Sequence, residues 1–255
     1  QKGVEKYKKA WEKILKVSIA DLKKNYGALD VHFEIWKGES DAEPYFPRLI
    51  EILEEKGLSY RSNGALVVDI AEPEDKKELP PCMILKSDGA SLYSTSDLGT
   101  IMDREKCYPK DWYLYIADSR QDLHYTSFFR VARKAELLPK TTKMNFLGFG
   151  TMNGKDGKPF KTRDGGVLRL EKLIEEIQES VLKRMEEGKD TVLSEEERKE
   201  TAKVIALAAL KYGDLSNQIT KDYIFDLEKF TAFEGNTGPY ILYTIVRIAS
   251  ILRKY

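Results

Sequence analysis

The chain has 255 residues, and its 42 lysines and arginines balance 42 aspartates and glutamates, so its formal net charge is zero. This length allows one large domain or two smaller ones with a sizeable core, and the charge balance alone indicates no nucleic-acid partner, although a local basic face is compatible with it. Two cysteines and two histidines argue against a Cys/His zinc site. Cys82 and Cys107 are not a close pair and suggest no disulfide framework, so we expect a protein of the reducing cytoplasm. No run approaches the roughly 18 apolar residues of a membrane helix, so we expect no membrane partner.

The first eighty residues alternate between helical and extended patterns. Apolar residues recur at three- and four-residue steps over 4–22, which predicts an amphipathic helix that ends near Gly27. The segments that follow predict a strand at 31–36, a helix at 46–56, a strand at 64–69 and a charged surface connector at 73–81.

The middle of the chain repeats one pattern of strand, turn and helix. The two units are 83–85 with a helix from about residue 93, and the buried strand 112–117 with the helix 122–134. This alternation predicts an α/β fold with parallel strands joined by right-handed crossovers. Ligands in such sheets sit beyond the carboxyl ends of the strands, where Tyr93, Asp97 and Gln121 fall.

The last part of the chain is predicted to be helical. A glycine-interrupted strand over 146–152 opens into a loop over 153–166. The helical runs expected after it are 170–187, 195–212, a run near 223–233, and a final helix after 235–239. We therefore expect an α/β part to about residue 166 and an all-helical part after it.

Tyr93 and Asp97 are four residues apart, so in a helix they share one face. A carboxylate beside an aromatic ring suits a planar cation, because it can accept two hydrogen bonds from a guanidinium while the ring lies against that group. Ser94 and Asp97 also have the spacing of a capping box, in which Asp97 would serve its own helix and bind nothing. These residues alone leave both interpretations open.

Gln121 and His124 follow the strand 112–117. Gln121 lies where a ligand would sit, but Asp118 and Gln121 also have the spacing of a cap pair. We expect His124 to be a packed or surface histidine rather than a catalyst.

The loop over 153–166 is rich in glycine and carries four cations, Lys155, Lys158, Lys161 and Arg163. Cations on such a loop can grip a triphosphate as charge builds on it. The alternative is a hairpin with solvent-facing lysines. The loop is not a Walker P-loop, because Pro159 follows Lys158 where that motif needs serine or threonine.

Seven stretches, taken together in their order and spacing, resemble the arginyl-tRNA synthetases, a family of class I aminoacyl-tRNA synthetases. They are 38–40, 86–89 with 93–97, 121–124, 148–152, 157–163, 211–216 and 233–240. The resemblance implies the second half of the Rossmann-like parallel sheet of the class I catalytic domain, followed by an all-helical segment. The implied domains are the catalytic part at 1–166, a helical connecting segment at 167–235 and the first helix of the anticodon-binding domain at 236–255.

The resemblance also implies roles for particular side chains. Tyr93, Asp97 and Gln121 would bind the substrate arginine, with Asp97 taking the guanidinium, which favours the ligand interpretation over the cap. The adenine side of the ATP site would be lined by Phe149, Gly150, Thr151 and Met152. The catalytic cations would be Lys158, Lys161 and Arg163, although this loop departs from the Lys-Met-Ser-Lys-Ser pattern of other class I synthetases. The residues that contact tRNA would be Tyr240, Tyr243 and Arg247.

The implied function is ATP-dependent ligation of L-arginine to its tRNA through arginyl-adenylate, with Mg²⁺ as a cofactor. The class I His-x-Gly-His motif is absent from this chain, whose only histidines are His32 and His124. The chain also begins at Gln1 inside a helical pattern, so we expect a catalytic-domain fragment that is inactive alone. Two alternatives remain: a synthetase for another amino acid, and a non-catalytic RNA-binding or interaction protein derived from a synthetase.

Overall fold

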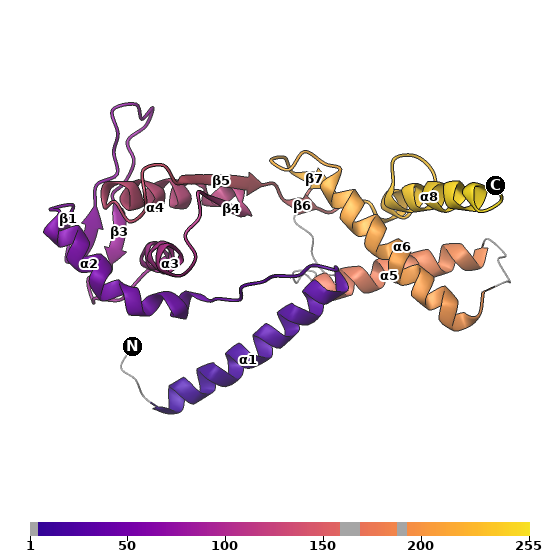
Figure 1. Cartoon of the computed structure of the whole chain (residues 1–255), viewed down its shortest axis with the longest axis horizontal. Helices are drawn as coiled ribbons and strands as arrows, with labels where there is room; N and C mark the ends of the chain where they lie inside the picture. The colour runs from indigo at the N-terminus through magenta and orange to yellow at the C-terminus, as the bar shows by residue number, and fades with distance from the viewer. Residues whose placement is uncertain (1–4, 159–168, 188–192) are drawn as a thin grey trace. The chain divides into compact units, whose positions relative to one another are not determined.

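The structure is a computed structural model that describes residues 5–158, 169–187 and 193–255. Its contacts divide the chain into two compact units (Figure 1). The sheet unit comprises Glu34–Phe149, and the helical unit comprises the described residues of Lys2–Phe33 and Gly150–Tyr255. The chain passes between the units at residues 33–34 and again at 149–150.

The sheet unit holds two small sheets of different kinds. An antiparallel sheet is formed by β1 (Ser59–Ser62), β2 (Ala65–Val68) and β3 (Cys82–Leu85), and a parallel pair by β4 (Trp112–Asp118) and β5 (Lys143–Phe149). Its helices are η1 (Glu39–Tyr45), α2 (Phe46–Glu55), α3 (Tyr93–Cys107), η2 (Ser119–Gln121) and α4 (Asp122–Lys134). The α/β class is therefore confirmed, with α4 as the crossover between the parallel strands.

The partner of β3 was predicted wrongly. The predicted neighbour of 83–85 was the strand 112–117 in a parallel sheet, but β3 pairs antiparallel with β2. Local connections explain the difference. Asn63 and Gly64 both have positive φ, at 48° and 82°, so they close a tight hairpin between β1 and β2. The connector after β2 then brings the chain back for a second antiparallel pairing.

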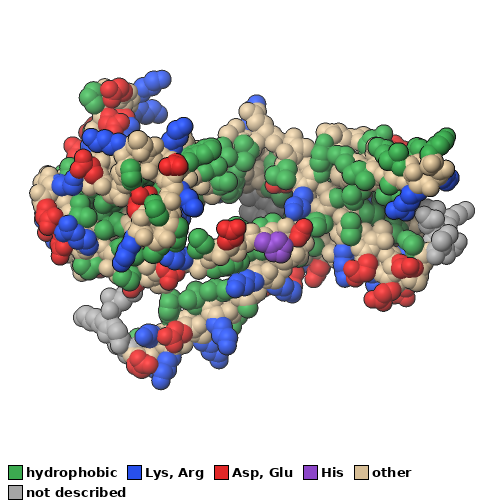
Figure 2. All heavy atoms as spheres, in the orientation of Figure 1, with side chains coloured by type: hydrophobic (Ala, Val, Ile, Leu, Met, Phe, Trp, Pro, Cys, Tyr) green, Lys and Arg blue, Asp and Glu red, His purple; other side chains and the backbone are tan. Residues whose placement is uncertain are grey.

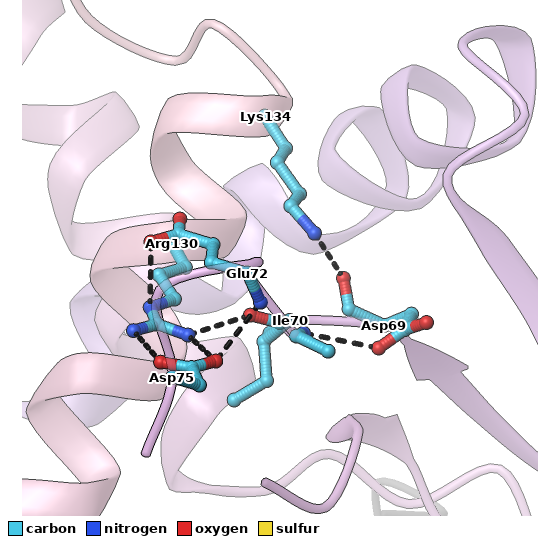
Figure 3. Close-up of polar contacts among 7 residues, drawn as sticks. Asp69, Ile70, Glu72, Asp75, Arg130 and Lys134 are labelled. Atoms are coloured by element: carbon cyan, nitrogen blue, oxygen red, sulfur yellow. Dashed lines mark hydrogen bonds and ion pairs between the residues drawn. The ribbon is translucent and has the colours of Figure 1, made fainter. Parts of the chain in front are cut away.

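That connector, residues 69–81, is held against α4 (Figure 3). The Arg130 guanidinium donates to both Asp75 carboxylate oxygens at 2.6 Å and to the Ile70 carbonyl at 2.9 Å. Lys134 donates to the Asp69 carbonyl at 2.7 Å. Most of the connector is exposed, as predicted, and these bonds fix where it leaves β2.

The core of the sheet unit lies between α2, α3, α4 and the antiparallel sheet. Its fully buried large side chains are Leu49, Leu53, Val68, Ile70, Ile84, Leu98, Ile101, Phe128 and Val131. On β4, Tyr113 is buried, whereas Trp112, Leu114 and Ile116 are exposed. The prediction of a wholly buried strand at 112–117 was therefore wrong for one face, since this period of two is that of a strand covered on one side.

Asp103 fastens the segment before α2 to α3. Its buried carboxylate accepts hydrogen bonds from Lys37, from Tyr45 at 2.9 Å and from Tyr108 at 3.2 Å. Burial raises the pKa of Asp103, but these donors outweigh burial and hold that pKa below its ordinary value. Lys37 directly precedes the stretch 38–40, so this carboxylate fixes its position.

The helical unit contains most of the predicted helices. Its elements are α1 (Glu5–Ala28), β6 (Met152–Asn153), α5 (Leu170–Glu187), α6 (Glu195–Leu215), β7 (Tyr223–Ile224), α7 (Leu227–Phe230) and α8 (Gly238–Leu252). The run near 223–233 is a two-residue strand and a short helix. Leu173, Ile177 and Val181 of α5 pack with Ala206 and Leu210 of α6 in its core.

Two predicted strands differ from the structure. Residues 31–36 form no strand, since no described strand lies beside them to complete a hydrogen-bonded ladder, and Phe33 instead packs edge-on against Tyr26 with centroids 4.9 Å apart. The strand over 146–152 is divided between β5 and β6. It divides at Gly150, where a Cβ would lie 2.2 Å from the Lys221 carbonyl carbon, so only glycine permits this approach.

Apolar side chains gather on the visible faces of α1 and α8 (Figure 2). In α1 no described residue is buried, and Tyr7, Ile14 and Val17 are well exposed. In α8 only Gly238 and Pro239 are buried. Neither helix, nor any other helix in the described ranges, is long and apolar enough to cross a membrane.

Candidate functional site

The start of α3 presents Tyr93 and Asp97 on one face. The Thr95 hydroxyl accepts the Leu92 N–H at 3.1 Å and donates to the Ile84 carbonyl of β3. Thr95, which is fully buried, therefore ties the first turn of α3 to the end of β3. The capping alternative for Ser94 and Asp97 was wrong, because Thr95 bonds to the residue that caps the helix.

Asp97 contacts His124 rather than its own helix terminus. The His124 Nε2 lies 2.6 Å from Asp97 Oδ2, and the two side chains are 25% and 36% exposed. The Tyr93 ring is edge-on to the His124 ring, with centroids 6.5 Å apart, and is 71% exposed. The structure thus brings two of the three predicted arginine-binding residues to one place.

Gln121 begins α4 as its N-terminal cap residue, but its side chain makes no capping bond. The cap-pair alternative is half right. Asp118 caps the short helix η2, because its carboxylate accepts from the Arg120 backbone N–H at 2.9 Å and from the Arg120 guanidinium at 2.6 Å, but this capping bond goes to Arg120 rather than to Gln121. These bonds lower the pKa of Asp118 to about 2. Gln121 is exposed one turn before His124, and its contact with arginine stays a prediction.

His124 is the residue of this site whose contact with Asp97 could not be predicted from the sequence. It packs against Phe128 and Tyr125, with centroids 5.2 and 5.5 Å apart, as the expectation of a packed histidine required. The bond to Asp97 was not foreseen. The spacing of Gln121 and His124 was the sequence signal that could have placed His124 in the site, because residues three apart share a helix face.

The aromatic side chains that pack against His124 belong to a larger aromatic cluster. Tyr125 stacks on Phe146 of β5, with centroids 4.4 Å apart and an interplanar angle of 11°. Tyr115 of β4 packs against Phe128 at 5.6 Å, and the Arg104 guanidinium lies 5.2 Å from the centre of the Tyr115 ring. These contacts join α3, α4 and both parallel strands.

The predicted adenine-binding residues fall in both units. Phe149 ends β5 in the sheet unit, whereas Gly150, Thr151 and Met152 belong to the helical unit. The Gly150 N–H donates to the Ile219 carbonyl at 2.9 Å, and the Thr151 N–H donates to Asp222 Oδ1 at 2.6 Å. The backbone of this segment is therefore fixed by the chain just before β7.

The glycine-rich loop begins with a tight turn. The Gly154 N–H donates to the Lys158 carbonyl at 2.8 Å, and Gly157 has a φ of 72°. Lys155 lies 3.3 Å from Asp226, which raises the pKa of Lys155, whereas Lys158 is exposed. The turn of the hairpin alternative is thus present, and Lys161 and Arg163 lie outside the described residues.

The predicted tRNA-contacting residues share one side of α8. Tyr240 and Tyr243 are about half exposed. The Arg247 guanidinium donates to the Tyr243 hydroxyl at 2.8 Å and lies 5.7 Å from the centre of that ring. Two aromatic rings and a cation are therefore displayed together.

The family is decided by comparison with known proteins. Residues 1–227 match the family model described as tRNA synthetases class I (R), catalytic domain. The chain belongs to this arginyl-tRNA synthetase family. A curated arginine–tRNA ligase of Agathobacter rectalis is 58% identical over 259 residues, and one of Alkaliphilus oremlandii is 52% identical over 254. Each match covers 100% of this chain and 43% of the relative, so the chain spans less than half the length of these proteins.

Solved arginyl-tRNA synthetases share the fold. The Plasmodium falciparum enzyme matches with a TM-score of 0.84 and 25% identity, over 99% of this chain and 42% of that one. The Thermus thermophilus enzyme matches with a TM-score of 0.76 and 20% identity, over 95% of this chain and 46% of that one. The domain limits at 166 and 235 remain predictions for this arginyl-tRNA synthetase chain.

Two of the stretches that carried the family resemblance, 211–216 and 233–240, meet in the helical unit. The Tyr212 hydroxyl donates to Asn236 Oδ1 at 2.6 Å. Gly238 approaches α6 so closely that a Cβ would lie 2.1 Å from the Ala208 carbonyl oxygen. In this chain these residues therefore set the position of α8, and hence of Tyr243 and Arg247.

Proposed function

We propose that the protein containing this chain activates L-arginine with ATP and transfers the arginyl group to an arginine-accepting tRNA. The observation that carries the proposal is the half-buried Asp97 carboxylate, which lies beside Tyr93 and takes no part in capping α3. Curated arginine–tRNA ligases that match the whole chain support the same activity.

Amino-acid selection rests on Asp97. A guanidinium offers two parallel N–H donors to a carboxylate, whereas the lysine ammonium is a point charge that cannot make this forked contact. The exposed Tyr93 ring can lie against the guanidinium plane, and the Gln121 amide can bind another polar group of the amino acid. Together these side chains would favour arginine over lysine.

ATP would bind along Phe149, Gly150, Thr151 and Met152 on its adenine side. Its phosphates would be held by Lys158, Lys161 and Arg163. Lys158 suits this role better than Lys155, which is paired with Asp226. The described residues contain no group of three or more His, Cys, Asp or Glu side chains able to hold a metal. Mg²⁺ would arrive with ATP, because its sites commonly include substrate phosphates.

In the first step the arginine carboxylate attacks the α-phosphorus of ATP, which forms arginyl-adenylate and releases pyrophosphate. In the second, a hydroxyl of the 3′-terminal adenosine of tRNA attacks the arginyl carbonyl and AMP leaves. The protein contributes mainly position and charge stabilisation. Tyr240, Tyr243 and Arg247 would bind the tRNA, and the cytoplasm is the proposed location.

The proposal is tested in the whole gene product by ATP–pyrophosphate exchange with tRNA present, across a panel of amino acids. Arginine is expected to support exchange, and lysine is expected to be used with a kcat/KM lower by about 10³-fold or more. Preference for another amino acid would show that the protein is a synthetase for that amino acid and not for arginine. The 255-residue chain alone is expected to give little or no aminoacylation.

A non-catalytic RNA-binding or interaction protein is the second candidate. The histidines of this chain provide no His-x-Gly-His motif, which fits this candidate as well as it fits a fragment of a catalytic domain. Exchange in the whole gene product would exclude it. Binding of tRNA without exchange for any amino acid would establish it.

A further inference from the structure

The arginine site contains an ionisable partner for Asp97 that the proposed function leaves without a role. His124 Nε2 lies 2.6 Å from Asp97 Oδ2. An ionised carboxylate only accepts hydrogen bonds, so Nε2 must carry the proton that joins them. One carboxylate oxygen is thereby committed to α4.

The His124 ring is fixed by its neighbours. Tyr93 lies edge-on to it, and Tyr125 and Phe128 pack against it at 5.5 and 5.2 Å between centroids. Tyr125 is itself stacked on Phe146. A ring held on these sides can turn little, so its bond determines the orientation of the Asp97 carboxylate.

We propose that His124 is a positioning residue that aims Asp97 at the arginine guanidinium. Its Nε2–H donates to Oδ2 and so fixes the orientation of the carboxylate that the guanidinium meets. The inference rests on the proposed role of Asp97 in binding arginine.

The test measures the KM and kcat for arginine in the whole gene product by ATP–pyrophosphate exchange at saturating ATP. The variants are His124→Gln, whose amide can replace the Nε2–H donor, and His124→Leu, which lacks the donor. The KM for ATP is the internal control, and circular dichroism verifies folding.

His124→Gln is expected to keep a KM for arginine within about threefold of wild type, because its amide restores the donor. His124→Leu is expected to raise the KM for arginine by about tenfold or more, with kcat changed less.

The outcomes separate the two hypotheses. If wild type supports exchange with arginine but a folded His124→Leu variant keeps the wild-type KM for arginine, the role of His124 is wrong and the proposed function stands. If wild type supports no exchange with arginine, the proposed function itself fails. If His124→Leu misfolds, His124→Gln still decides the question, because a KM for arginine raised about tenfold or more in that variant would contradict the role of the donor.

Discussion

The Thr95 hydroxyl joins α3 to β3, since it accepts the Leu92 N–H at 3.1 Å and donates to the Ile84 carbonyl. Thr95→Val keeps the volume of this buried side chain but leaves both backbone groups without that partner. We expect the free energy of unfolding to fall by about 1–3 kcal/mol, measured by urea denaturation. Ser94→Ala is the matched control, and a larger loss there would restore Ser94 as the cap.

The Asp75–Arg130 pair is expected to make stability depend on acid. Hydrogen bonds from Arg130 lower the pKa of Asp75 to about 2, from an ordinary value of 3.8. Because the folded pKa is the lower one, the contribution of the pair is fully present above about pH 4 and is lost as the pH falls toward 2. Thermal unfolding should show a steeper loss of Tm over that window in wild type than in Asp75→Asn. Equal slopes of Tm against pH in wild type and Asp75→Asn would show that Asp75 does not contribute to the loss of stability in acid. Asp111→Asn, at an exposed aspartate, is the control.

At Gly238, α8 lies so close to α6 that any side chain there is expected to destabilise the protein. In Gly238→Ala the new Cβ would lie 2.1 Å from the Ala208 carbonyl oxygen. We expect a loss of about 1–3 kcal/mol in unfolding free energy, because α6 and α8 must separate. The control is Gly27→Ala in α1, where nothing lies within 4 Å of the new Cβ. There, higher helix propensity is expected to add about 0.5–1 kcal/mol, so similar effects at both sites would contradict this account.

Arg247→Ala is expected to weaken tRNA binding without changing arginine activation. The lost cation should reduce the slope of log affinity against log salt by about one, measured by filter binding over a range of salt concentrations. Arg48→Ala, in which the arginine removed pairs with Glu51 and Glu55 on α2, is the control. An unchanged salt slope in Arg247→Ala would exclude a phosphate contact at this residue.

Local patterns in the sequence predicted the helices well. The limits of α4 at 122–134 and of α5 at 170–187 agree with the structure, because apolar periodicity and terminal residues define a helix within its own segment. Strands depended on partners that no local pattern reveals. The segment 31–36 alternates like a strand yet has no described neighbour to pair with, and β3 joined β2.

The site shows the same limit. Tyr93 and Asp97 could be placed on one face from their spacing alone, since a helix fixes that relation. That the Thr95 hydroxyl also reaches β3 and that His124 reaches Asp97 depended on where β3 and α4 pack against α3. Those are tertiary contacts between residues 11 and 27 positions apart, which no local spacing reveals, whereas the bond from Leu92 to Thr95 is local.

The central claim is that the Asp97 carboxylate binds the arginine guanidinium. The most direct measurement is the kcat/KM for arginine in ATP–pyrophosphate exchange by the whole gene product carrying Asp97→Asn, with tRNA present and Asp111→Asn as the matched control. We predict a fall of about 10³-fold for Asp97→Asn, since one oxygen acceptor and the negative charge are lost, and a change within about twofold for the control. A folded Asp97→Asn variant with near-wild-type kcat/KM for arginine would contradict the account.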